Sequence, residues 1–384
     1  MLKIILVPYS SLVILFGFWS CWTPTSHEVS SELAVHYEKE TRVEVGNAFI
    51  GVEFHKSQSI PQRISFFYPV ANSIDRSNDY WTRDTSFVMD WQLTIGDDDP
   101  ISIGREQGKL ELTPYRAIFR NSNEHFSTNA DYSFCLDKSA MILGLTIQNT
   151  SQVAADYTLE TSLYTALKTC HTYRLVDQAR TSIADNGRTI YTTFDDPDTR
   201  ETCVFVTNAG ATPIASLVPT NNLKGGPHSN FVYSRHLAPG ETLDIIQIIG
   251  SVLSGEELNT VSYLQNNYKN EVAAFEESIK EKISTTSSFN AGNPTDDHSI
   301  TWAKAVLEVN RHYLDGEIVP MPCPAEYNFY FTHDVLVTDL AAVNFDLERV
   351  RNDLDYIIRH SDENKIIPHA YYWKDGAYRT EYAS

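Results

Sequence analysis

The chain has 384 residues, enough for two or three domains, and its apolar fraction of 42% excludes both a disordered chain and a multi-span membrane protein. It carries 50 acidic against 30 basic residues, a formal net charge of −20, so it repels phosphate backbones, which argues against a nucleic-acid partner. Aromatic residues make up 12% of the chain, and composition does not separate rings of a core from rings of a stacking surface.

The first 26 residues have the pattern of an export signal. Lys3 precedes two apolar stretches, and the longer one, Leu12 to Trp19, is too short to span a bilayer. Ser20 places a small residue before Cys21, which indicates a lipidation site at Cys21. We therefore expect an exported protein, periplasmic or at the outer surface, with an anchor at Cys21 as one alternative and a tether over residues 27–42.

Residues 43–253 carry the pattern of an all-β domain. Short alternating apolar runs, such as those at residues 89–95, 143–147 and 157–163, are separated by turn clusters rich in Gly, Asp and Pro. An antiparallel sheet of this size needs a second sheet to cover its apolar face. We therefore predict a large antiparallel β-sandwich, a supersandwich, over residues 43–253.

The pattern changes to a helical period at residue 254. Ser254 and Glu257 have the spacing of a capping box, and apolar residues then recur every three or four positions from Leu258 to Ile283. A Ser/Thr/Gly/Pro-rich segment follows, from Ser284 to Pro294. We predict a linker helix and a linker over residues 254–298.

The last segment, residues 299–384, has the pattern of helices joined by aromatic loops. One helical face runs from Trp302 to Tyr313, a second helix covers Asp334 to Val343, and Asp346 caps a third. The loops are expected at residues 316–332 and 361–375. The multidomain fold predicted is thus all-β followed by all-α.

These two loops carry the chemistry. Three prolines stiffen the first until His333 and Asp334 reach a helix N-terminus, where the dipole favours a carboxylate and Asp334 serves as a cap or a ligand-binding group. Carboxylates accept bonds from sugar hydroxyls, and ring faces pack on sugar C–H groups, so the loops suit an oligosaccharide or polysaccharide. The predicted substrate-binding residues are His333, Asp334, Tyr330, Phe331, His369, Tyr372 and Trp373.

Cofactor and metal chemistry have little support in the sequence. His333, Asp334 and His369 lack the spacing of a zinc motif, and the cysteines form no Cys-x-x-Cys pair. We expect no cofactor and no metal. One disulfide between two of Cys135, Cys170 and Cys203 stays open as an alternative.

The order of sandwich, linker helix and aromatic loops resembles the six-hairpin glycosidases with (α/α)6 barrels, namely glucoamylase-like and glycogen-debranching (amylo-α-1,6-glucosidase) enzymes and related disaccharide phosphorylases. The resemblance rests on Trp302-Ala303, on Val319 to Pro322 and above all on Tyr330 to Asp334. It implies that Asp334 holds the non-reducing-end sugar, with His333 where Arg is commoner. The loop from Pro368 to Trp373 is similar to the second substrate-binding loop.

The resemblance also implies an incomplete barrel, because residues 299–384 supply only the first of its helices. Glycoside cleavage needs a general acid and a second carboxylate, and the family carries both on later loops, so no catalytic residue is assigned. The expected function is the N-terminal part of an exported glycoside hydrolase acting on α-glucosides. A carbohydrate-binding surface lipoprotein and a disaccharide phosphorylase are the alternatives.

Overall fold

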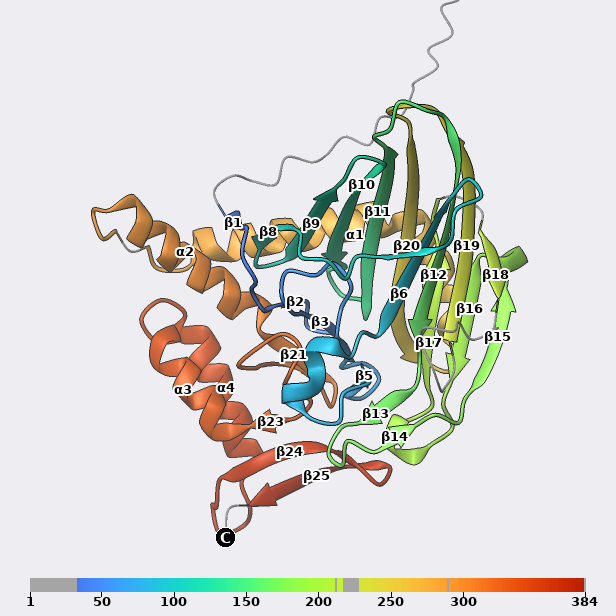
Figure 1. Cartoon of the computed structure of the whole chain (residues 1–384). Helices are drawn as coiled ribbons and strands as arrows, with labels where there is room; N and C mark the ends of the chain where they lie inside the picture. Colours follow the sequence, from blue (N-terminus) through green and yellow to red (C-terminus); the bar gives the residue numbers. More distant parts are fainter. Residues whose placement is uncertain (1–32, 211–212, 217–227, 289, 383–384) are drawn as a thin grey trace, which may run out of the picture.

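The computed structural model describes residues 33–210, 213–216, 228–288 and 290–382, and it consists mainly of antiparallel sheets followed by four helices (Figure 1). This confirms the predicted β-sandwich followed by a few helices. The export signal and Cys21 lie outside the described residues. No helix among the described residues has the length and apolarity that crossing a membrane requires.

The largest sheet has nine strands. In spatial order they are β1 (Val35–Tyr37), β8 (Lys109–Thr113), β9 (Arg116–Ser122), β10 (Phe126–Phe134), β11 (Ala140–Asn149), β20 (Thr242–Leu253), β17 (Thr202–Asn208), β16 (Thr189–Thr193) and β15 (Arg180–Ala184). Strand β1 pairs with β8, so part of the segment expected as a tether is an edge strand.

Two smaller sheets complete the sandwich. The five-stranded sheet contains β18 (Ile214–Ser216), β19 (His228–Leu237), β12 (Ala155–Tyr164), β6 (Met89–Ile95) and β7 (Ile101–Ile103). The six-stranded sheet contains β14 (Leu175–Val176), β13 (Leu167–Thr169), β5 (Asn72–Asp75), β4 (Arg63–Phe66), β3 (Ile50–Phe54) and β2 (Val43–Gly46).

One core lies between these sheets. The register of β11 with β20 sets Leu145 opposite Ile245 and Ile147 opposite Leu243, and all four side chains are buried. Trp91, on the five-stranded sheet, is fully buried in the same core. Because side chains alternate along a strand, the alternating pattern of the sequence was sufficient to place these residues inside.

Helix α1 (Glu257–Thr285) packs on the outer face of the large sheet, where Val261 and Leu264 join a second core. The predicted capping box at its start was wrong. Glu256 is the N-cap residue, it makes no side-chain cap bond, and the Glu257 carboxylate instead accepts a bond from the Gly255 amide. The helix thus begins without a side-chain cap, and its first buried residue is Val261.

The C-terminal region holds three further helices, α2 (Pro294–Val309), α3 (Thr332–Ala342) and α4 (Leu347–Arg359). Asn293 caps α2 and Asp346 caps α4, the latter as predicted. Asp334 does not cap α3, because the N-cap position is Phe331 and Asp334 lies in the first turn.

Strands lie in and beside the loops expected at residues 316–332 and 361–375, and Tyr313, expected on the first helix, belongs to one of them because α2 ends at Val309. This corrects the all-helical prediction for residues 299–384. The strands are β21 (Arg311–Leu314) with β22 (Glu317–Pro320), and β23 (Tyr330–Phe331) with β24 (Pro368–Lys374) and β25 (Ala377–Tyr382). Asp315–Gly316 and Asp375–Gly376 connect the two hairpins, and all four residues have positive φ. Asp-Gly in this conformation is a favoured hairpin turn, so a signal for these strands was present in the sequence.

The four described cysteines are free thiols. Cys135, Cys170 and Cys203 are buried, and burial raises the pKa of each thiol, that of Cys203 to about 11. The disulfide left open by the sequence is therefore not formed.

Candidate sugar-binding surface

The candidate sugar-binding surface begins at the junction between β23 and α3. Asp334, in the first turn of α3, accepts a hydrogen bond of 2.8 Å from the Tyr327 hydroxyl, and its other oxygen lies 3.0 Å from Nε2 of His333. Three quarters of the Asp334 side chain is covered, whereas His333 is largely exposed. Burial and the Asp334 carboxylate both raise the pKa of Tyr327, so Tyr327 stays protonated and donates this bond.

His369 reaches the same place from β24. Its ring is parallel to that of His333, with centroids 5.6 Å apart, and it contacts Phe331 edge-on at 5.5 Å. Pairing of Phe331 with Ala370 in the three-stranded sheet brings the two segments together. His333, Asp334, Phe331 and His369 thus form one cluster, although they lie on two segments separated by α4 in the sequence.

The remaining predicted residues lie elsewhere. Tyr330 is fully buried on the opposite side of β23, against Tyr356, because neighbouring residues of a strand face opposite ways. Trp373 turns toward the sandwich, where its indole N–H donates to the Pro197 carbonyl at 3.0 Å. Tyr372 is buried and packs against Phe329 at the edge of the cluster.

Two further rings belong to the surface. The ring centroids of Phe329 and Phe331 are 4.4 Å apart. Tyr327 contacts Phe331 edge-on, with ring centroids 5.8 Å apart. Tyr327, Phe329 and Phe331 alternate along the chain, a pattern that also fits one core face, but all three are only partly buried. Alternation defines a shared face without saying whether that face is covered.

A buried ion-pair network supports the loop from behind. Arg63, on β4, donates to the Glu326 carboxylate at 3.1 Å and to its backbone carbonyl at 3.2 Å, and Arg83 also bonds that carboxylate. Arg83 in addition donates to Glu53 at 2.8 Å. Burial alone would raise the pKa of Glu53, but His55 and Arg83 hold it below its usual range. The network fixes the loop before Tyr327 to the sandwich.

Three carboxylates of this region, from Glu44, Glu53 and Glu326, have oxygens within 4.8 Å of one another. Arg83 bonds both Glu53 and Glu326, and Arg63 bonds Glu326. Glu44 is partly buried and accepts from the Ala325 amide at 2.9 Å, and desolvation raises its pKa. The two guanidinium groups already supply the positive charge, so this cluster is better described as an ion-pair network than as a cation site.

No family model matches the sequence, and neither does any curated protein. Among solved structures, the chain is similar to a bacterial glucoamylase complexed with acarbose, with a TM-score of 0.53 and 12% identity over 88% of this chain and 53% of that one. It is also similar to a protein described as a kojibiose phosphorylase from the human microbiome, with a TM-score of 0.51 and 12% identity over 90% of this chain and 45% of that one.

This likeness concerns the fold, since the identity is low. The chain spans about half the length of each of these two structures.

Proposed function

We propose that the chain is the sugar-binding part of an exported glycoside hydrolase that acts on α-glucosides. The single observation that carries the proposal is the cluster at the start of α3, where Asp334 is held by Tyr327 and lies beside the exposed ring of His333 and the partly exposed rings of His369 and Phe331. A fixed carboxylate beside ring faces suits a pyranose, whose hydroxyls donate to the carboxylate while its C–H face packs on a ring. The structural likeness to glucoamylase supports the same class of ligand.

Asp334 and its neighbours account for binding only, and the general acid and base stay unassigned. Hydrolysis of a glycosidic bond needs two carboxyl groups on either side of that bond, and Asp334 alone supplies one contact to a hydroxyl. Export and a lipid anchor at Cys21 belong to the same proposal, and they rest on the sequence of residues 1–26.

The test is calorimetric titration of the chain with maltose and isomaltose. Replacing Asp334 with Ala should weaken binding about tenfold to a hundredfold, as expected for losing a charge-assisted hydrogen bond, with little change in the thermal midpoint. Asp97, exposed in a turn of the sandwich, gives the matched control Asp97→Ala, which should bind like the unaltered chain. Unchanged affinity in Asp334→Ala would contradict the proposed site.

A disaccharide phosphorylase is the second candidate, favoured by the likeness to kojibiose phosphorylase. The two reactions differ in what attacks the sugar, water in one and phosphate in the other. Titration with inorganic phosphate in the presence of the disaccharide separates them, because only a phosphorylase gains affinity for phosphate when the sugar is bound.

A further inference from the structure

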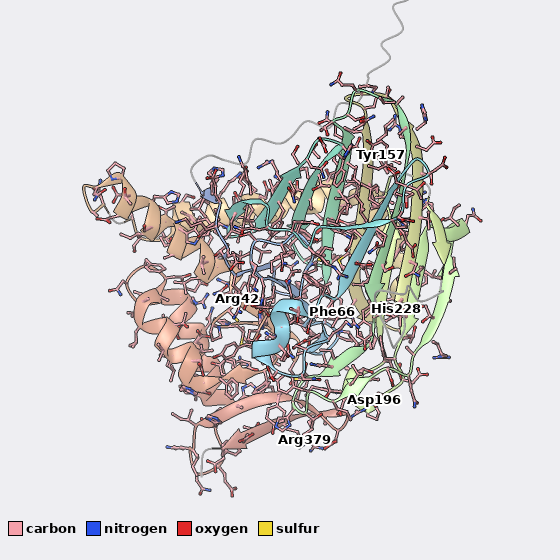
Figure 2. The ribbon with its side chains drawn as sticks, viewed as in Figure 1. Arg42, Phe66, Tyr157, Asp196, His228 and Arg379 are labelled. Carbon is pink, nitrogen blue, oxygen red and sulfur yellow. The ribbon has the colours of Figure 1, made fainter. Side chains whose placement is uncertain are left out.

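A turn of the β-sandwich borders the sugar-binding surface that the C-terminal region forms. It connects β13 to β14 and includes residues 170–174, beside β24 and β25 in Figure 1. The Cys170 thiol donates to the Asn328 carbonyl at 2.8 Å, and Cys170 shares a small core with Ala370 and Tyr372. Further contacts anchor the same side, since the Asp375 amide donates to Asp198 at 2.6 Å. Asp196 and Arg379 mark the two sides of this contact in Figure 2.

His171, in this turn, extends the row of rings. Its ring stacks on Tyr372 with centroids 4.1 Å apart and an interplanar angle of 25°, and it lies 6.2 Å from Phe329. Phe329 in turn contacts Phe331, so partly buried rings run from His171 to the pair of His333 and His369. Nδ1 of His171 is buried without a hydrogen-bond partner among the described residues, so the fold makes no use of it as a polar group.

Tyr173 lies at the tip of the same turn. It has a φ of +50°, a left-handed conformation that is costly for a bulky side chain, and 47% of the residue is exposed. Its hydroxyl bonds none of the described residues, although Glu326 and Arg63 lie within electrostatic range. Strained positions of this kind cluster at binding and active sites.

We infer that His171 and Tyr173 form a second sugar subsite beside the one around Asp334, so that the site takes an oligosaccharide rather than a monosaccharide. This rests on the proposed function and adds to it the length of the ligand. A sugar held by Asp334 lies against Phe331, and the next sugar along the row of rings then lies over Phe329 and His171. Ring faces supply its packing, and the Tyr173 hydroxyl supplies a hydrogen bond.

Calorimetric titration with glucose and with maltotriose tests the second subsite. His171→Ala and Tyr173→Asn should each weaken maltotriose binding about tenfold while leaving glucose binding unchanged. Asn is used at position 173 because it tolerates the left-handed conformation. Asp334→Ala should weaken both ligands, and His236→Ala, at an exposed histidine of β19, should change neither.

Each outcome of these titrations either supports or overturns the second subsite. Unchanged maltotriose affinity in both turn variants would overturn the second subsite while the effect of Asp334→Ala still supported the first. Equal losses for glucose and maltotriose in His171→Ala, with a lowered thermal midpoint, would show that His171 only holds the two parts together. Tyr173→Asn then decides, because Tyr173 is exposed and its hydroxyl bonds none of the described residues. If the unaltered chain bound neither sugar, the proposed function and the second subsite would both be wrong.

Discussion

At the scale of single residues, Asp339 and Asp353 form a buried pair between α3 and α4. None of their carboxyl oxygens has a hydrogen-bond donor among the described residues, and the nearest cation, Nε of Arg349, lies 3.9 Å from Asp339. The pKa of Asp353 lies well above its usual range. Burial is the largest cause, and the charge of the Asp339 carboxylate is the second. The two carboxyl groups are therefore best satisfied when they share a proton.

This pair predicts that acid stabilises the contact between α3 and α4. The folded-state pKa of Asp353 lies above the unfolded value of about 4, so the stability that it contributes is complete below that value and is lost as the pH rises through the folded pKa. Asp353→Asn should reduce the fall in unfolding free energy with rising pH, whereas Asp355→Asn, exposed on the same helix, should keep it. Denaturant unfolding across the pH range measures both, and identical slopes in the two variants would contradict the shared proton.

At the scale of elements, α1 shows what a helical pattern in the sequence predicts and what it leaves open. The apolar stripe from Leu258 to Ile283 correctly predicted one helix, but its members differ in burial. Leu264 is fully buried against the large sheet, whereas Leu258 is 67% exposed. Periodicity gives the face of the helix, and only the position of the sheet edge decides which turns of that face are covered.

The difference between these two leucines is measurable. Leu264→Ala should lower the unfolding free energy by about 2–4 kcal/mol, because it removes buried methyl groups and leaves a cavity. Leu258→Ala makes the same chemical change at an exposed position of the same helix and should cost less than about 0.5 kcal/mol. Chemical denaturation of both variants provides the comparison, and equal losses would show that α1 does not pack as described.

At the scale of the whole molecule, the sandwich and the C-terminal region are joined through Glu326. Its side chain is one third exposed, yet it bonds Arg63 and Arg83, which are almost completely buried on the sandwich side. The Ser65 hydroxyl adds a bond of 2.6 Å to the Ala325 carbonyl. The loop before Tyr327 therefore depends on strands that come some 260 residues earlier in the sequence.

Removing the charge of Glu326 should loosen this junction. Glu326→Gln leaves the Arg63 guanidinium without its carboxylate partner, and we expect a loss of about 1–3 kcal/mol in unfolding free energy. Hydrogen exchange should increase in residues 323–331 first. Glu363→Gln is the control, since Glu363 is exposed and forms no ion pair with the described residues. Equal behaviour of the two variants would count against a junction at Glu326.

The helices α3 and α4 differ from the sandwich in how well their apolar side chains are covered. Apolar residues on both helices are exposed, namely Val337, Leu340, Leu347, Leu354 and Ile358. Helices that bury little apolar surface open at low free energy. Amides of α3 and α4 should thus exchange faster than those of β11 and β20, as measured on the 384-residue chain by mass spectrometry, and slow exchange throughout α3 and α4 would contradict this.

Local pattern was sufficient for much of the architecture. Alternation identified the strands of the sandwich, and a period of three to four residues identified α1. Asp346 was recognised as a cap because capping depends on neighbouring residues only. The hairpins at Asp315–Gly316 and Asp375–Gly376 carry an equally local signal, although the helical pattern around them favours loops there.

Only part of the candidate site can be predicted from local sequence pattern in this way. The sequence alone determined that His333 and Asp334 begin a helix beside an aromatic segment, because that follows from residues adjacent in the chain. Only the tertiary structure decided that His369 joins them, that Tyr330 and Trp373 do not, and that His171 borders the same row of rings. These contacts depend on strand pairing and on the docking of the sandwich turn, which bring together residues far apart in the chain, and no local pattern records such distances.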